Sequence, residues 1–429
     1  MQQQLPLAKG FMRDTLGEGV FADVHVSQKH LAVPYEAVPV LEHDIAALDR
    51  FHLCAHERDA SLDTLYNGIV VEGFFVPHDN VFTFVSSCHT FISIRSVCQP
   101  VNGGKGLQVR SLYIHIPFCQ GTCDYCDFLS FPLDREEVLH RYLEALCVEM
   151  ALYSGEVFQT LYLGGGTPSI LSVEQISLID RCLHDSFNLD GLREFTLEVN
   201  PETVDPERAR RWIRAGVNRV SLGVQSFDGR VLSAHHRRAH PGDEHRAFQI
   251  FRQCGVANLN VDLILGLQLC HAVPEEATAV SIFEEDLNRA VALSPEHISL
   301  YILSLPEGST SKAKEHLSFS EQTVEKLYLY SVRFLTDHGF EQYEISNFAR
   351  PGFESVHNRQ YWRGGEYRGL GLGAVSTLGN RRMRNVETLQ EYLHLTEGGR
   401  RPVGEVEILD SPVREFEAVS YTHLRAHET

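Results

Sequence analysis

The sequence predicts an α/β fold whose centre is a partial barrel of six parallel strands, each followed by a helix. Three observations predict it. From Ser111 onward, strand-like runs alternate with amphipathic helical stretches, which requires crossover connections and a parallel sheet. The runs are rich in β-branched and aromatic residues, as suits strands buried on both faces. Unusual polar residues fall at or near the ends of the runs, where parallel α/β folds carry their chemistry.

The six repeats can be placed in order along the chain. We expect strands at 111–116, 160–164, 194–200, 218–224, 258–266 and 297–303. We expect helices near 134–153, 173–187, 205–215, 242–254, 280–292 and 321–338. This count favours a partial barrel, with a closed eight-stranded barrel as the alternative.

Four segments make up the chain. Residues 1–108 alternate short β-like runs with turns, carry no readable motif and end near the linker-like NGGKG. We interpret them as an N-terminal extension of unclear fold and role, either fused or wrongly joined. We expect residues 109–345 to form the barrel and residues 346–418 to form a C-terminal α/β region that is truncated. Residues 419–429 resemble a translated sequencing adapter, so we expect the true chain to continue beyond about residue 418.

Composition and charge narrow the class of protein. Hydrophobic residues make up 43% and charged residues 22% of the 429, as in ordinary globular proteins. A net charge of −19 argues against nucleic acid or an anionic membrane as the main partner. The sequence contains no run of about 18 apolar residues, the length needed to span a bilayer. Its first residues also lack the apolar core of a secretory signal. We therefore expect a cytoplasmic protein.

Seven of the ten cysteines are scattered along the chain and read as buried small hydrophobes. So few cysteines do not make a disulfide scaffold, and a reducing compartment fits best. The seven are Cys54, Cys88, Cys98, Cys147, Cys182, Cys254 and Cys270.

The other three cysteines, Cys119, Cys123 and Cys126, follow the first strand within eight residues. Thiolates bind soft or borderline metals, so an iron–sulfur cluster, a zinc site and no metal are the three alternatives. Zinc would need a fourth ligand, and His115 is expected to face away. A three-cysteine cubane instead leaves one iron open to a small molecule. Aromatic neighbours would keep it dry, so an iron–sulfur cluster is favoured.

Further candidate residues follow or end the later strands. GGGTP (164–168) lets a backbone approach a ligand closely, or is a plain strand-to-helix turn. No lysine follows it, so it is not a phosphate loop. Glu198 and Asp262 lie in apolar strands, where a carboxylate needs hydrogen bonds or an ion pair. A ligand contact and a structural salt bridge with an arginine are both open.

Several motifs together resemble a known family. Cys-x3-Cys-x2-Cys resembles the radical S-adenosylmethionine (SAM) superfamily. LYIHIPFC, LYLGGGTPS, LEVNPETV, NRVSLGVQSFD and NVDLILGL are similar to its coproporphyrinogen-oxidase-like branch, over about residues 111–385. The oxidases of that branch carry a further cysteine two residues after the third, where this chain has Phe128. The form CDF is similar to the HemW subgroup, regarded as haem chaperones.

The resemblance implies a [4Fe-4S] cluster on the three cysteines, with SAM chelating the open iron. Haem would be the cargo, passed to an acceptor protein, with a flavodoxin or ferredoxin as electron donor. The alternative is an oxygen-independent coproporphyrinogen III oxidase, which decarboxylates two propionates by 5′-deoxyadenosyl radical chemistry. A structural zinc protein is the third possibility.

The resemblance also assigns residues to SAM. Gly165, Gly166 and Thr167 would contact its methionyl amino group, Glu198 its amino and ribose groups, and Asp262 its ribose hydroxyls. Gln225 would hydrogen-bond the same ligand, and Tyr113 would contact it. Arg237 would meet its carboxylate, while the neighbouring Arg238, His235, His236 and His240 are expected at the surface.

A last motif, HNRQYW (357–362), matches a pattern of this branch proposed for haem handling. A neutral imidazole is a good axial ligand, so His357 is a candidate haem ligand. Tyr361 and Trp362 would flank the porphyrin. A structural role at the barrel mouth is the alternative.

Overall fold

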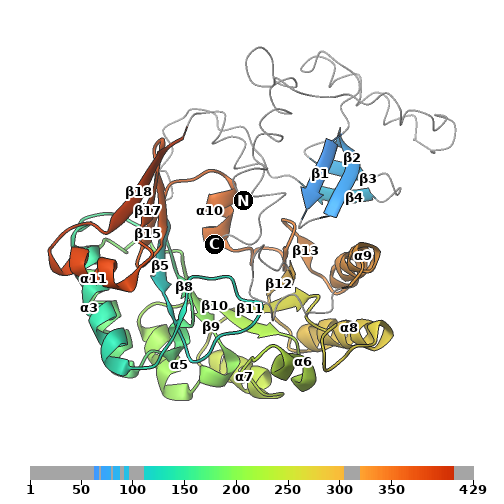
Figure 1. The fold of residues 1–429 in the computed structure, drawn as a ribbon, viewed down its shortest axis with the longest axis horizontal. Helices are drawn as coiled ribbons and strands as arrows, with labels where there is room; N and C mark the ends of the chain where they lie inside the picture. The colour runs from blue at the N-terminus through green and yellow to red at the C-terminus, as the bar shows by residue number, and fades with distance from the viewer. Residues whose placement is uncertain are drawn as a thin grey trace, which may run out of the picture. The chain divides into compact units, whose positions relative to one another are not determined.

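The computed structural model describes residues 111–303 and 319–409, and the backbone of four strands nearer the N-terminus (Figure 1). The chain forms two compact units, Met1–Pro100 and Val101–Thr429. In the first, four strands pair in chain order as an antiparallel sheet. They are β1 (Leu62–Tyr66), β2 (Ile69–His78), β3 (Val81–Ser86) and β4 (Phe91–Arg95). The NGGKG stretch and residues 419–429 lie outside the described residues.

The second unit is built on the six expected parallel strands, which lie side by side in chain order. They are β5 (Ser111–Ile116), β8 (Thr160–Gly165), β9 (Glu194–Val199), β10 (Arg219–Gln225), β11 (Asn258–Leu265) and β12 (His297–Ile302). The expected helices are α3 (Glu136–Ala151), α4 (Val173–Ser186), α5 (Pro206–Arg214), α7 (Asp243–Gln253), α8 (Glu276–Ala292) and α9 (Glu321–Asp337). The predicted strand–helix repeats are confirmed.

The sheet is open, as a partial barrel requires. Its strand order is β13-β14-β12-β11-β10-β9-β8-β5-β15-β16-β17-β18, so β5 and β12 pair with later strands instead of with each other. The strands β13 (Glu341–Gln342) and β14 (Asn347–Ala349) extend one edge. The other edge is extended by β15 (Tyr367–Leu370), β16 (Val375–Leu378), β17 (Arg381–Asn385) and β18 (Val403–Ile408).

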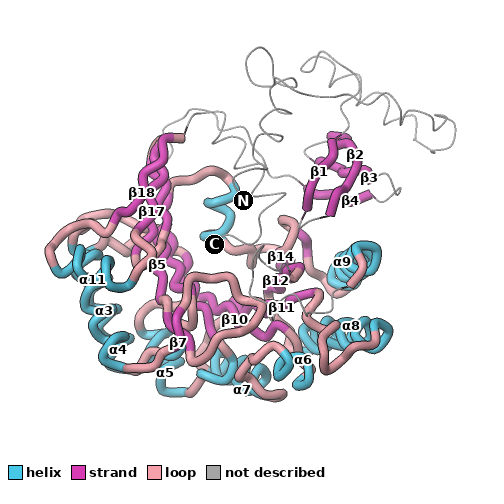
Figure 2. The backbone as a smooth tube through the Cα atoms, in the orientation of Figure 1, coloured by secondary structure: helices cyan, strands magenta, loops and turns pink. Residues whose placement is uncertain are grey.

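Three further helices are short. Helix α6 (Gly229–Ala234) follows β10, and α11 (Leu389–Glu397) lies between β17 and β18. Helix α10 (Val356–Trp362) lies across the sheet from the helices that cover its other side (Figures 1 and 2). No described helix is long and apolar enough to cross a bilayer.

The two faces of the barrel sheet differ in polarity. On β8, Leu161 and Leu163 are fully buried on one face, while Thr160 and Tyr162 hydrogen-bond across the other. Strand side chains alternate between faces, so this inner face carries every second residue of each strand. Further members of it are Ser111, Thr196, Ser221, Asn260 and Ser299. The strands are buried on both faces as expected, but only one of those faces is apolar.

Local sequence fixes where several helices begin. Ser172 caps α4, accepting from the Gln175 backbone N–H while the Gln175 side chain accepts from the Ser172 N–H. Asp205 caps α5, whose first residue is Pro206. These caps end the loops that leave the carboxyl ends of β8 and β9, and so define one edge of the sheet.

Helices α3 and α4 are joined by a disulfide between Cys147 and Cys182. The interpretation of these two as separate small hydrophobes is therefore wrong, because the packed helices bring their side chains together at half-buried positions. Cys270 is buried and Cys254 half-buried, both as free thiols. Cys54, Cys88 and Cys98 lie outside the described residues.

Candidate functional site

The three clustered cysteines follow β5 and are free thiols: Cys119 ends the two-residue strand β6 (Phe118–Cys119), and Cys123 and Cys126 lie on the loop after it. The loop is closed at its base, where the Phe131 N–H donates to the Pro117 carbonyl (2.8 Å) and the Leu133 N–H to the Cys119 carbonyl (2.7 Å). Among the described residues, no three Cys, His, Asp or Glu side chains converge on one metal ion. A cubane cluster does not require such convergence, since each thiolate binds a different iron.

The GGGTP loop packs against this cysteine segment. The Gly166 N–H donates to the Ile116 carbonyl, and the Thr167 N–H to the Phe118 carbonyl, both at 2.8 Å. A Cβ on Gly166 would lie 2.7 Å from the Phe118 carbonyl oxygen, so only glycine allows this approach. The Thr167 hydroxyl then donates to the Cys119 sulfur at 3.3 Å. The loop therefore places a threonine against the first cysteine.

Glu198 faces the inner side of the sheet beside the same loop. Its Oε1 accepts from the Tyr162 hydroxyl (2.7 Å) and its Oε2 from the Gly165 N–H (2.9 Å). Burial raises the pKa of Glu198 to about 7. No described arginine pairs with it, so the alternative of a structural salt bridge is not seen here.

Asp262 also has neutral partners. Its Oδ2 accepts from the Ser221 hydroxyl (3.0 Å) and its Oδ1 from the Asn260 side-chain amide (2.7 Å). Burial raises the pKa of Asp262. As with Glu198, no described arginine forms an ion pair with this carboxylate. Two buried acids held by neutral donors keep some capacity to accept hydrogen bonds from a polar ligand.

Tyr113 lies on β5 and contacts His115. The His115 Nε2 donates to the Leu129 carbonyl (2.8 Å), so its Nδ1 is the acceptor for the Tyr113 hydroxyl (2.9 Å). Burial lowers the pKa of His115, which favours this neutral form. Both ring nitrogens are thus occupied away from the cysteines, in line with the expectation that His115 is not a fourth ligand.

Gln225 and Arg237, near the carboxyl ends of the barrel strands, each have a buried polar atom without a hydrogen-bond partner in the described part of the chain. Gln225 has φ = +68°, and its buried Oε1 has no hydrogen-bond partner among the described residues. Arg237 donates to the Gly223 carbonyl (2.6 Å) and to Asn200 Oδ1 (2.9 Å), and its Nη1 approaches the Cys123 sulfur (3.9 Å). Its Nε is buried without a partner in the same region. Buried polar atoms are rarely left unpaired, so these two atoms are candidate contacts for a ligand.

The residues next to Arg237 were expected at the surface. His236, Arg238 and His240 are exposed, as predicted. His236 Nδ1 lies 2.9 Å from Asp124 Oδ2, on the cysteine loop. The expectation is wrong for His235, which is 2% exposed because its Nε2 hydrogen-bonds the Leu267 carbonyl (2.9 Å).

Asn200 is a site residue that the sequence reasoning missed. Its Oδ1 accepts from Arg237, and its Nδ2 donates to the Thr167 hydroxyl at 3.2 Å. It therefore links the arginine to the GGGTP loop. The signal was present, because Asn200 directly follows β9 at the edge where the other polar residues gather.

His357 lies at the opposite, amino edge of the sheet. It is fully buried, with Nδ1 3.0 Å from the Thr160 hydroxyl and Nε2 2.9 Å from the Tyr361 hydroxyl. Its backbone N–H donates to Glu194 (2.9 Å), and Thr160 and Glu194 are the first residues of β8 and β9. Burial lowers the pKa of His357 to about 3. Of the two roles left open by the sequence, this geometry favours the structural one.

Comparison with known proteins agrees with this layout. Residues 113–268 match the model of the Radical SAM superfamily, a span that contains every residue assigned to SAM. The heme chaperone HemW of Bacillus subtilis is 36% identical over 300 residues, covering 67% of this chain and 76% of that protein. HemW of Lactococcus lactis is 32% identical over 288 residues, covering 66% and 74%. The chain belongs to the HemW family of radical SAM proteins.

The structural comparison points the same way. Coproporphyrinogen III oxidase (HemN) of Escherichia coli, a radical SAM enzyme, aligns with a TM-score of 0.64 and 25% identity. The alignment covers 73% of this chain and 75% of HemN. The fold and family expected from the motifs are confirmed. In this member of the HemW family, Phe128 is 49% exposed beside the cysteine loop.

Proposed function

We propose that this protein holds a [4Fe-4S] cluster on Cys119, Cys123 and Cys126, binds SAM beside it, and carries haem to an acceptor protein in the cytoplasm. One observation carries the first two parts: Arg237 Nη1 lies 3.9 Å from the free thiol of Cys123, while Arg237 Nε and Gln225 Oε1 are buried without a hydrogen-bond partner among the described residues. The methionyl end of SAM is zwitterionic, and the molecule has both hydrogen-bond donors and acceptors, so it can satisfy groups of both kinds.

Different residues of the chain would contact different groups of SAM. Arg237 would face the SAM carboxylate, because its guanidinium approaches the Cys123 sulfur of the cysteine loop (3.9 Å). Glu198 would accept from the amino group, and Asp262 from the ribose hydroxyls. The glycine loop, with Gly165 and Gly166, would let the methionyl end approach the backbone. When bound, the cluster and SAM supply one-electron reductive cleavage of the SAM sulfur–carbon bond.

Two further residues shape this end of the site. Thr167, which donates to the Cys119 sulfur, would orient the first cluster ligand. Tyr113 would cover the ligand from β5. Its ring lies 6.0 Å from that of Tyr162, which donates to Glu198. The polar groups are thus held in fixed positions before a ligand arrives.

The proposal of haem as cargo rests on the family. The curated relatives are named heme chaperones, and the chain covers about three quarters of their length. A flavodoxin or ferredoxin would supply the electron. The second candidate function, oxygen-independent coproporphyrinogen III oxidase, is favoured by the similarity to HemN. Phe128, in place of the further cysteine of the oxidases, argues for the chaperone.

A paired experiment separates these two functions. The protein, reconstituted with iron and sulfide without oxygen, is titrated with haem, while a parallel sample receives coproporphyrinogen, SAM and dithionite. We expect saturable haem binding and no decarboxylated porphyrinogen by chromatography. The apo-protein is the control for non-specific haem binding. Decarboxylated product would instead establish the oxidase.

A further inference from the structure

The turn that begins at the last residue of β10, residues 225–228, is held in an unusual conformation. Gln225 has φ = +68°, a region that residues with a Cβ rarely adopt, and the pairing of β10 with β11 shifts register between Gly223 and Gln225. The Ser226 N–H donates to the Val224 carbonyl (2.9 Å), which tightens the turn. This conformation sends the Gln225 amide back over the strand. A Cβ on Gly223 would lie 3.1 Å from both Gln225 Nε2 and Arg237 Nη2.

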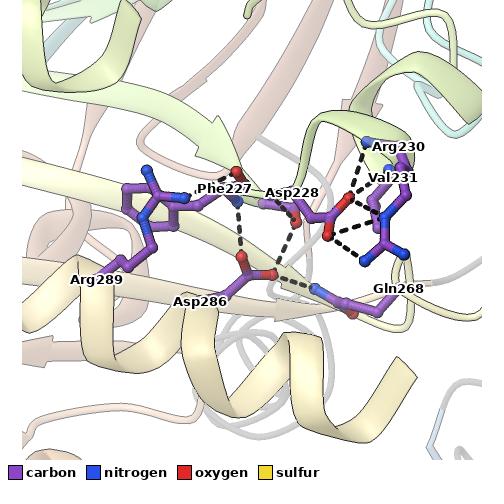
Figure 3. A network of polar contacts seen from close by, with 8 residues as sticks. Phe227, Asp228, Arg230, Val231, Gln268, Asp286 and Arg289 are labelled. Atoms are coloured by element: carbon purple, nitrogen blue, oxygen red, sulfur yellow. Dashed lines mark hydrogen bonds and ion pairs between the residues drawn. The ribbon is translucent and has the colours of Figure 1, made fainter. Parts of the chain in front are cut away.

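A single carboxylate holds this turn from behind. Asp286, on α8, is 1% exposed. Its Oδ1 accepts from the Phe227 N–H (2.6 Å; Figure 3). Its Oδ2 accepts from the Ser226 hydroxyl (2.8 Å). The Ser226 oxygen in turn accepts from the Asp228 N–H (3.2 Å). Asp286 therefore fixes the residues that directly follow Gln225.

The same carboxylate reaches the next strand as well. Asp286 Oδ2 accepts from Gln268 Nε2 (2.9 Å) (Figure 3). The Gln268 Oε1 accepts from the Gly266 N–H (3.1 Å), just beyond β11, which carries Asp262. Three neutral donors thus converge on one buried carboxylate, and a carboxylate is the side chain that accepts without donating. One group thereby links the ends of the two strands that carry Gln225 and Asp262.

Helix α8 also contacts the turn through a second residue. One turn along from Asp286, Arg289 donates to the Phe227 carbonyl (3.1 Å), and its guanidinium lies 4.8 Å from the centre of the Phe227 ring (Figure 3). Both the N–H and the carbonyl of Phe227 are therefore bound to the same helix. Asp286 has no ion-pair partner among the described residues, so its charge is held by neutral hydrogen bonds alone. A carboxylate buried in this way is costly, which favours a role beyond packing.

We propose that Asp286 is a positioning residue for the SAM site, holding Gln225 in its left-handed conformation with the side-chain amide directed at the ligand. The inference rests on the proposed function, since it names a residue that supports the same site. Asp286 touches no ligand itself and acts through the turn.

The test measures SAM binding by the reconstituted wild type, by Asp286→Asn, by Gln225→Ala and by the double variant, using equilibrium dialysis. In Asp286→Asn, the side-chain NH₂ would replace the oxygen that accepts from Gln268 Nε2 and the Ser226 hydroxyl. Two donors would then face each other, and the turn would be held less tightly. We expect Asp286→Asn to weaken SAM binding roughly tenfold, with unchanged iron content. In the Gln225→Ala background the same substitution should cost less than about twofold, because the group it positions is gone.

Glu149→Gln is the matched control. Glu149 is also a buried carboxylate with three neutral donors: the Gly371 N–H (2.8 Å), the Asn385 amide (2.7 Å) and the Tyr392 hydroxyl (2.6 Å). It ties α3 to the C-terminal strands instead of to the turn. We expect its substitution to lower the melting temperature while the SAM affinity stays at the wild-type value.

The outcomes separate the two proposals. Unchanged SAM affinity in Asp286→Asn, or equal fold-losses with and without Gln225, would overturn the positioning role while leaving the proposed function intact. Absence of SAM binding by the wild type would overturn the proposed function and this inference with it. If Asp286→Asn does not fold, Ser226→Ala removes one donor from the same network. It should weaken SAM binding severalfold, and unchanged affinity in that variant would also overturn the role.

Discussion

At the residue scale, the burial of His357 favours a structural role over haem ligation. The motif around it invites a haem-ligand interpretation, but each ring nitrogen lies within hydrogen-bond distance of a hydroxyl, from Thr160 or Tyr361. An axial ligand would have to give up one of these contacts and come out of the protein interior. Sequence alone could not show this, because Thr160 and His357 are 197 residues apart along the chain. The burial depends on how α10 packs on the sheet.

The lowered pKa of His357 predicts how the free energy of unfolding changes with pH. It falls from the ordinary value of 6.5 to about 3, so the unfolded chain binds the proton more tightly. Stability should therefore fall as the pH drops from about 6.5 toward 3, by at most about 1.4 kcal/mol per pH unit from this residue. We expect His357→Gln to show a shallower loss in urea unfolding at pH 7, 6 and 5. His297, with its pKa also lowered by burial, is common to both proteins and cancels in the comparison. Equal pH slopes would contradict the assignment.

The residues of the proposed SAM site show which functional residues the sequence can and cannot reveal. The cysteines, Glu198, Gln225 and Asp262 could be found because each is polar or reactive at or near the end of an otherwise apolar strand. Asp286 could not be found in this way. It lies within a helix beside other acidic residues, and only the fold shows that its side chain turns inward to the loop after β10.

The elements themselves followed closely from the sequence, with informative exceptions. The six strands and their helices were predictable because the strand-like runs and amphipathic helices have different periods. Helix α6, with six residues, is too short for that signal. The pairing of β15 with β5 joins Tyr367 to Ser111 across most of the described chain. Such long-range pairing depends on tertiary structure, so the C-terminal extension of the sheet was not foreseen.

The disulfide between α3 and α4 leads to a prediction at the scale of these elements. Cys147 and Cys182 are 35 residues apart, and closing a loop of that length stabilises a protein by roughly 2–4 kcal/mol. We expect a Cys147→Ser/Cys182→Ser double variant to lose about that much unfolding free energy relative to the oxidised wild type.

Reduction supplies the control for that comparison. With excess dithiothreitol present, the wild type and the double variant should unfold at nearly the same urea concentration. Thiol counting before and after unfolding would show which fraction of the wild type is bridged. Equal stability of the two proteins under oxidising conditions, with the bridge shown to be present, would contradict the prediction.

At the scale of the whole barrel, the polar inner face connects the fold to its chemistry. Its carboxyl edge carries the cysteine loop, the glycine loop and the unsatisfied groups of Gln225 and Arg237. Its amino edge is occupied by α10, through the contacts of Glu194 and His357. A ligand at the carboxyl edge would therefore meet preformed hydrogen-bonding groups, and the apolar packing on the other face of the sheet would hold those groups in place.

The central claim is that three cysteines and this polar edge together hold a cluster whose open iron takes SAM. The most direct measurement is electron paramagnetic resonance of the reduced, reconstituted protein before and after addition of SAM. The account predicts a reduced [4Fe-4S] signal whose g-values shift when SAM binds, and the loss of that signal in Cys123→Ser. An unchanged spectrum with SAM, or zinc in place of iron in protein purified without oxygen, would contradict it.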